Sequence, residues 1–155
     1  MSANETQVGG THYRTPFQHW DLAHELDLGY FEGQVSKYLT RHRFKKGKED
    51  AEKALHFAKK LHELALLSAR QPRHKYTTIA RMTEYAESNK LLPLEYACIM
   101  SVCNWSMPQD LEMLQERIQR LIRECYPEVP VGEMQELIFD TGEPGAGYVD
   151  QGKDI

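Results

Sequence analysis

Residues 31–54 read FEGQVSKYLTRHRFKKGKEDAEKA, and this stretch predicts two helices joined by a tight turn. Apolar side chains recur at helical spacing as far as Phe44, and the KKGK segment that follows has the composition of a turn. Glu49 and Asp50 come directly after it, where acidic side chains complement the dipole of a new helix. We therefore expect helices over about 31–44 and 48–69.

The rest of the chain has a helical pattern as well, without strand-like alternation or a repeat of fixed period. Proline and glycine punctuate most of the expected boundaries. The other expected helices are Gln18–Leu28, Thr77–Ser88, Pro93–Trp105, Pro108–Cys125 and a short one that ends near Phe139. This pattern predicts an all-α, single-domain helical bundle of about five to seven helices.

The two ends of the chain differ from its middle in composition. Residues 1–16 and 141–155 are polar and contain several glycines, so we expect a mobile N-terminal leader and a flexible C-terminal tail. The helical domain then covers residues 17–140, with halves at 17–70 and 71–140. In its first helix, we expect most of the apolar face to consist of Trp20, Ala23, Leu26 and Leu28.

Composition is that of a soluble globular protein, with 155 residues, 41% apolar and 27% charged. No apolar run reaches the ~20 residues that a membrane span needs, and the first residues lack the pattern of a signal peptide. Three cysteines without zinc-type spacing are typical of reduced thiols. We therefore expect a cytoplasmic protein that makes no contact with a membrane.

Charge is unevenly distributed along the chain. Residues 37–75 carry twelve Lys or Arg against four Asp or Glu, whereas residues 76–155 carry six against fourteen. A basic segment favours phosphate-bearing partners, although it could instead dock on the protein's own acidic half. Nucleic acid is an unlikely partner, because the basic residues spread over several helix faces and the net charge is −4.

A candidate anion site lies on the helix expected over 31–44. At 100° per residue, Gln34, Lys37 and Arg41 share one sector beside the apolar face, and Gly33 adjoins them. A glycine inside a helix costs about 1 kcal/mol of stability relative to alanine, so the presence of Gly33 calls for an explanation. One is the close approach of a ligand. The other is the close approach of a neighbouring helix, with Lys37 and Arg41 engaged in ion pairs.

Asp50 falls within the apolar sector of the following helix, where a carboxylate is costly unless it is paired. Arg41 or Lys37, across the turn, is the natural partner. A magnesium-binding role is the alternative, because Mg²⁺ with a nucleotide needs only one or two carboxylates. Lys53 lies one turn further on and could meet phosphate in the same groove. No Walker A loop is present, since Glu49 follows Gly47-Lys48 where Ser or Thr is required.

The segment GTHYRTPFQHWDLAHELDLGYFEGQVSKYLTRHRFKKGKEDAEKA resembles a family of small phage proteins. These share HY near the N-terminus, a proline, and a pattern like FEGNxxKYxxRxxxKxGxxDLxKA. The resemblance covers about residues 10–60, and Gln34 and Ala51 stand where the family has Asn and Leu. The matching residues are His12, Tyr13, Pro16, Phe31, Glu32, Gly33, Lys37, Tyr38, Arg41, Lys45, Gly47, Asp50, Lys53 and Ala54.

Members of this family carry the label nucleotide kinase, so the resemblance implies phosphorylation of (deoxy)nucleoside monophosphates with ATP and Mg²⁺. It implies that Lys37, Arg41 and Asp50 are catalytic and that Glu32 and Asp50 hold the metal. The implied nucleotide- and phosphate-binding residues are His12, Tyr13, Gly33, Gln34, Lys37, Arg41, Lys45 and Lys53.

Two other functions are compatible with the sequence. One is a non-catalytic phage protein that binds a nucleotide or a host protein. The other is an all-α nucleoside triphosphate pyrophosphohydrolase, for which Glu49, Asp50 and Glu52 are few and closely spaced. A broad apolar stripe on a small helical protein is also typical of a homo-oligomer.

Overall fold

A computed structural model describes the chain except for residues 1, 7, 12–13, 69–71, 73 and 130–155. The described residues form six α-helices and two short 3₁₀ helices, with no strand among them. The α-helices are α1 (His19–Glu25), α2 (Tyr30–Arg41), α3 (Lys48–Ser68), α4 (Ile79–Asn89), α5 (Pro93–Asn104) and α6 (Pro108–Cys125). The 3₁₀ helices are η1 (Ala3–Glu5) and η2 (His42–Phe44). The predicted all-α architecture is confirmed.

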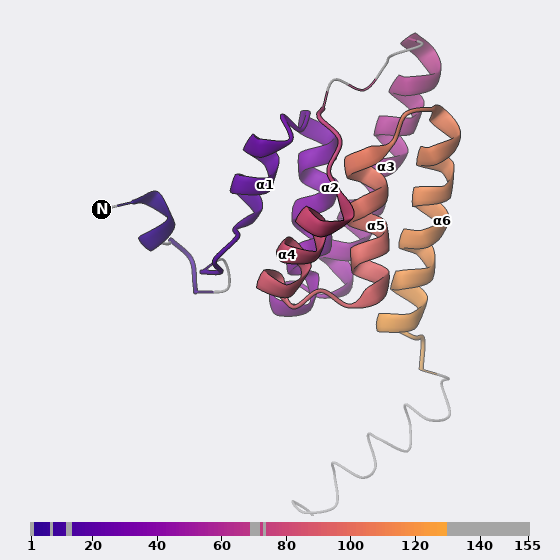
Figure 1. Cartoon of the computed structure of the whole chain (residues 1–155). Coiled ribbons are helices and arrows are strands. Elements are labelled where there is room, and N and C mark those ends of the chain that lie inside the picture. Colours follow the sequence, from indigo (N-terminus) through magenta and orange to yellow (C-terminus); the bar gives the residue numbers. More distant parts are fainter. Residues whose placement is uncertain (1, 7, 12–13, 69–71, 73, 130–155) are drawn as a thin grey trace, which may run out of the picture.

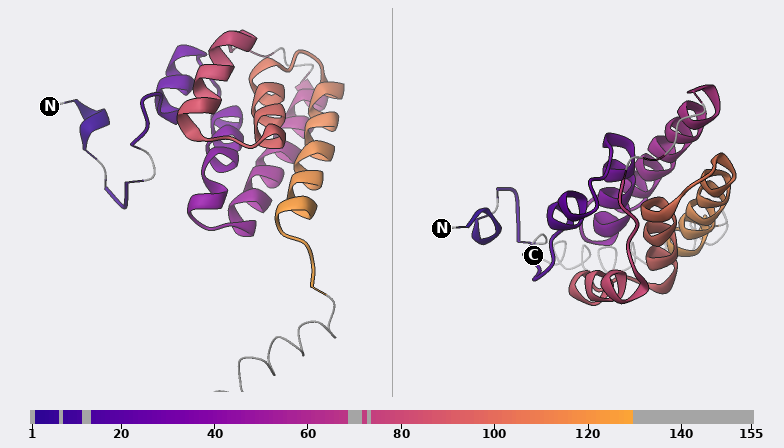
Figure 2. Two further views of the ribbon diagram at one scale, coloured as in Figure 1. Left: turned by 60° about the horizontal axis from the view of Figure 1, so that its bottom comes forward. Right: turned by 45° about the horizontal axis from the view of Figure 1, so that its top comes forward.

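Four of the helices form a closed bundle (Figure 1). α2 packs against α3 and α5, and α6 packs against the same two helices, so the cyclic order is α2, α3, α6, α5. α1 lies against the outer side of α2, and α4 lies beside α5. Figure 2 shows α1 and α4 outside the four-helix core, on the side away from α6. The N-terminal half of the chain therefore shares one core with the second half.

Local sequence explains where most helices begin and end. Pro93 and Pro108 occupy the first turns of α5 and α6, where a missing backbone N–H has no cost. Thr78 caps α4 by accepting a hydrogen bond from the Arg81 amide at 3.1 Å. Gly47 adopts φ +58° between η2 and α3, a conformation that glycine adopts without strain.

The core matches the predicted stripes on α3 and α6 closely. Buried residues there include Ala54, Ala58, Leu61 and Ala65 on α3, and Leu111, Leu114, Ile118 and Leu121 on α6. The prediction for the first helix was wrong in one respect: Trp20 is 48% exposed, and the buried residue of α1 is Leu22. α1 is short and contacts the bundle mainly through α2, so only a narrow face is covered.

The described part of the leader lies on the α1 side of the molecule (Figure 1). The Asn4 side chain donates to Asp21 at 3.1 Å, and Thr15 Oγ1 donates to Asn89 Oδ1 at 3.2 Å. The leader therefore contacts both α1 and α4, while its mobility stays a prediction. The predicted tail and the expected helix near Phe139 lie outside the described residues. No helix in the described ranges is long and apolar enough to cross a membrane.

Candidate functional site

Where α2 borders α3, positive charge gathers around one aromatic ring. Lys37 Nζ lies 4.8 Å from the centroid of the Tyr38 ring, Arg41 Cζ lies 4.7 Å from it and Lys53 Nζ lies 5.8 Å from it. Phe57 of α3 stacks on the same ring, with the two ring centroids 5.8 Å apart. Because an aromatic face attracts cations, Tyr38 partly offsets the repulsion between these three groups. Three of the predicted phosphate-binding residues thus come together in space.

Asp50 pairs with Arg41, one of the two partners that the sequence left open. Arg41 Nε donates to Asp50 Oδ2 at 3.1 Å, and Nη2 donates to Oδ1 at 3.3 Å. The Asp50 side chain is completely buried, and its Oδ2 also accepts from the Lys46 amide at 3.4 Å. Both carboxylate oxygens are therefore engaged, and the pair fixes the Arg41 guanidinium at the junction between α2 and α3.

Glu32 lies on a different face of α2 and serves the core. Its Oε1 accepts a hydrogen bond from the Trp105 indole at 3.1 Å, and its side chain is buried. Glu32 and Arg41 are nine residues apart, which is about 13 Å along the helix axis and half a turn around it. Glu32 is therefore not brought together with Asp50, and the two do not form a shared magnesium site. Among the residues that the structure describes, no three His, Cys, Asp or Glu side chains group as metal ligands.

Two adjacent pockets flank the cationic face of α2. The first, which we call the tryptophan pocket, has a volume of about 460 Å³. It is lined by Ala3, Thr6, Val8, Gln18, His19, Trp20 and Lys37. The second, which we call the cation pocket, has a volume of about 370 Å³. It is lined by Thr11, Arg14, Thr15, Pro16, His19, Thr40, Arg41, Phe44, Ser88, Asn89 and Lys90. Since His19 lines both, the pockets meet at this residue.

Positive charge in these pockets is poorly compensated. The described residues that line them include Arg14, Lys37, Arg41 and Lys90 but no Asp or Glu, although the chain carries 23 acidic residues. Asp50, which is buried and does not line the pocket, offsets the charge of Arg41. Within the described part of the chain, the other three cations have no carboxylate partner. Burial lowers the pKa of Lys37, and the charge of Arg41 lowers it further; Asp50 opposes the shift, and Lys45 adds a smaller lowering.

The side chain between the two pockets, His19, is uncharged. Ser36 Oγ lies 2.9 Å from the Glu32 carbonyl oxygen and 3.2 Å from that of Gly33, so its proton points to the backbone. His19 Nε2, 2.7 Å from Ser36 Oγ, is therefore the donor in that contact, and Nδ1 is left as an acceptor. Burial lowers the pKa of His19 to about 4, with the charge of Lys37 as the second cause. The ring is uncharged at neutral pH.

The remaining predicted residues lie around this face without lining either pocket. A Cβ added at Gly33 would meet no atom within 4 Å, so the explanation by close helix packing was wrong. Gln34 is half-buried and Lys45 is exposed. Lys53 pairs with Glu49 at 2.6 Å on the surface of α3. His12 and Tyr13 lie outside the described residues.

A second polar cluster lies just beyond the C-terminal end of α2, in η2, and sequence patterns gave no indication of it. Buried His42 contacts Glu95 Oε1 through Nε2 and the Tyr126 hydroxyl through Nδ1, both at 2.7 Å. Arg43 Nε donates to Glu95 Oε1 at 2.6 Å. Burial alone would raise the pKa of Glu95, but hydrogen bonds from His42, Arg43 and the Leu92 amide hold it below its usual value. This cluster ties η2 to α5 and α6.

Sequence reasoning also missed His19, Arg14 and Lys90 as pocket residues. They belong to three separate segments, and only the tertiary fold brings them to one place. Lys90 ends α4 in the left-handed region at φ +54°, where glycine is the usual residue, so no sequence signal marked its position. No protein-family model, curated protein or solved structure matches the chain. The resemblance to phage proteins thus rests on the motif residues alone.

Proposed function

We propose that the protein binds a nucleotide across the two pockets, with the phosphate held by Lys37, Arg41, Arg14 and Lys90. The observation that carries this proposal is the absence of any carboxylate among the described residues that line either pocket. In an acidic chain, random placement would mix the two signs of charge. A phosphate would receive charge-assisted hydrogen bonds from these side chains, which are among the stronger ones in proteins.

Electrostatics favours an anion over a neutral ligand at this site. The pKa of Lys37 is lowered by burial and by Arg41, with Asp50 opposing the shift, so its charged form is less stable than that of a free lysine. A bound phosphate would stabilise that charged form and raise the pKa again. Arg41 contributes differently, because Asp50 fixes its orientation in advance. A preorganised guanidinium loses little conformational entropy when the ligand arrives.

The reaction that we propose is phosphoryl transfer from ATP to a (deoxy)nucleoside monophosphate, in a phage protein that acts in the host cytoplasm as a homo-oligomer. Positioning and neutralisation of phosphate charge supply most of the catalysis in such reactions. The engaged Asp50 and the distant Glu32 do not fit a metal site on the protein. We therefore assign no residue to Mg²⁺, which enters as part of the substrate MgATP.

Binding without catalysis is the second candidate function. The lining of the two pockets favours binding alone. The described residues there include no acidic group that could orient a metal or activate water. A protein of this kind would sequester a nucleotide. The pyrophosphohydrolase alternative requires several acids on facing helices, and the part of the chain that the structure describes has no such group.

One assay separates these functions. The protein is incubated with ATP, Mg²⁺ and each deoxynucleoside monophosphate in turn, and the products are separated by ion exchange. Formation of the diphosphate, with loss of activity in Lys37→Gln, supports the kinase. Saturable binding without any product supports sequestration. A folded protein that neither binds nor converts any nucleotide would overturn the proposal.

A further inference from the structure

Trp20 occupies a position that packing of the core does not explain. It is 48% exposed, whereas Leu22 and Leu26 on the same segment are buried. It has no ring partner among the described residues, although several other aromatic side chains form ring pairs. A large indole left in solvent exposes apolar surface at a cost in free energy. Such a residue is typical of a binding surface.

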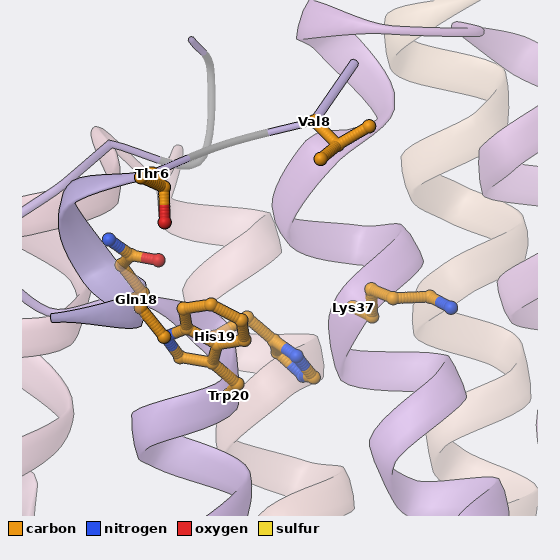
Figure 3. Close-up of a pocket in the computed structure, with 7 residues that line it drawn as sticks. Thr6, Val8, Gln18, His19, Trp20 and Lys37 are labelled. Atoms are coloured by element: carbon orange, nitrogen blue, oxygen red, sulfur yellow. The ribbon is translucent and has the colours of Figure 1, made fainter. Parts of the chain in front are cut away.

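The surroundings of Trp20 suit a flat apolar group attached to a phosphate. Figure 3 shows His19 and Trp20 on one side of the tryptophan pocket, with Val8 across from them. Lys37 lies on the neighbouring helix, and its ammonium group points away from the two rings. His19 is uncharged at neutral pH, so it does not repel an apolar ring. Because His19 also lines the cation pocket, a single ligand can place its phosphate there and its other end against Trp20.

We infer that Trp20 is the stacking platform for the nucleobase and so determines the preference for nucleotides over other phosphate esters. This inference rests on the proposed function and assigns its base-binding part. Any base has a π-face, so stacking on Trp20 gives affinity without selecting strongly among the four bases. Loss of the indole should therefore weaken binding of all four deoxynucleoside monophosphates, by about tenfold to a hundredfold.

The test compares two ligands that share a sugar and a phosphate and differ in the base. Deoxyadenosine monophosphate and 2-deoxyribose 5-phosphate are titrated into the wild type, Trp20→Leu and Trp20→Phe by calorimetry. A matched control is Tyr76→Leu, which removes an exposed aromatic ring outside both pockets. Tryptophan fluorescence gives a second readout, because the only other indole, Trp105, is 2% exposed and reports on the core.

We expect the wild type to bind the nucleotide at least tenfold more tightly than the sugar phosphate. Trp20→Leu should abolish that difference without weakening the sugar phosphate, and Trp20→Phe should keep most of it. The nucleotide should quench fluorescence in the wild type but not in Trp20→Leu. Equal nucleotide affinity in Trp20→Leu and the wild type would overturn the inference and leave the proposed function standing. Failure of both ligands to bind the wild type would overturn both.

Discussion

Arg41 and Asp50 are joined by two hydrogen bonds, of 3.1 and 3.3 Å, across the turn between α2 and α3. The carboxylate is completely buried, and the arginine side chain is 14% exposed. The pair links the core to the cation pocket, because Arg41 also lines that pocket. Arg41 therefore has a structural role as well as the proposed role in binding phosphate.

Arg41→Ala should destabilise the fold by about 3–5 kcal/mol, because it leaves the buried Asp50 carboxylate without its cation. The measurement is the free energy of unfolding in urea. Arg41→Ala combined with Asp50→Ala should recover part of the loss, since the unpaired charge is gone. If Arg41→Ala unfolds like the wild type, the pair has no structural role and the residue serves binding alone.

Gly33→Ala should stabilise the protein by about 1 kcal/mol. The added methyl group meets no atom within 4 Å, and alanine is the better helix former. Thermal melting without ligand checks this prediction. If a ligand approaches the backbone at Gly33, the same variant should also bind nucleotide more weakly. A lower melting temperature in Gly33→Ala would show instead that the helix needs the glycine.

Glu95 and Glu124 form a matched pair for testing the second polar cluster. Each accepts a hydrogen bond of 2.6 Å from an arginine Nε, but the side chain of Glu95 is 1% exposed and that of Glu124 is 53% exposed. Glu95→Ala should cost about 3–5 kcal/mol of unfolding free energy, because His42 and Arg43 lose a buried partner. Glu124→Ala should cost less than about 1 kcal/mol. Similar losses in urea denaturation would contradict the assigned role of burial.

The pKa of His19, lowered to about 4 by burial and by Lys37, makes stability depend on pH. The unfolded chain gains a proton at His19 below its ordinary pKa of 6.5, whereas the folded protein resists it until about pH 4. Stability should therefore fall between these values, by up to about 3 kcal/mol. In His19→Gln, the urea midpoint should depend less on pH over this range. In His24→Gln, at an exposed site on the same helix, the pH dependence should stay as in the wild type. An unchanged pH slope in His19→Gln would refute the assignment.

Local signals made much of the fold predictable from sequence. Pro93, Pro108 and Thr78 mark helix starts that agree with the structure within about two residues. A carboxylate on an apolar face predicted that Asp50 needs a partner, but the choice between Arg41 and Lys37 was left open. Tertiary placement was not predictable. Trp20 fits an apolar stripe by spacing, yet α1 covers too narrow a face to bury it.

The candidate site was predictable only where it lies on one helix. Lys37 and Arg41 share a helical sector, so their proximity follows from spacing alone. His19, Arg14 and Lys90 join them through contacts between segments up to 76 positions apart in sequence, which no local pattern encodes. The contacts of Glu32 with Trp105 and of Glu95 with His42 also join distant segments, so the sequence did not predict them.

The central claim is that the carboxylate-free pockets bind a nucleotide through their cations. Its most direct test is the affinity for a deoxynucleoside monophosphate, measured by calorimetry at low salt in the wild type, Lys37→Gln and Lys60→Gln. Lys60 is a control because it pairs with Glu63 on the exposed surface of α3, outside both pockets. We predict saturable binding that weakens with salt, a loss of roughly tenfold to a hundredfold in Lys37→Gln, and no change in Lys60→Gln. Equal affinities in the wild type and Lys37→Gln would contradict the claim.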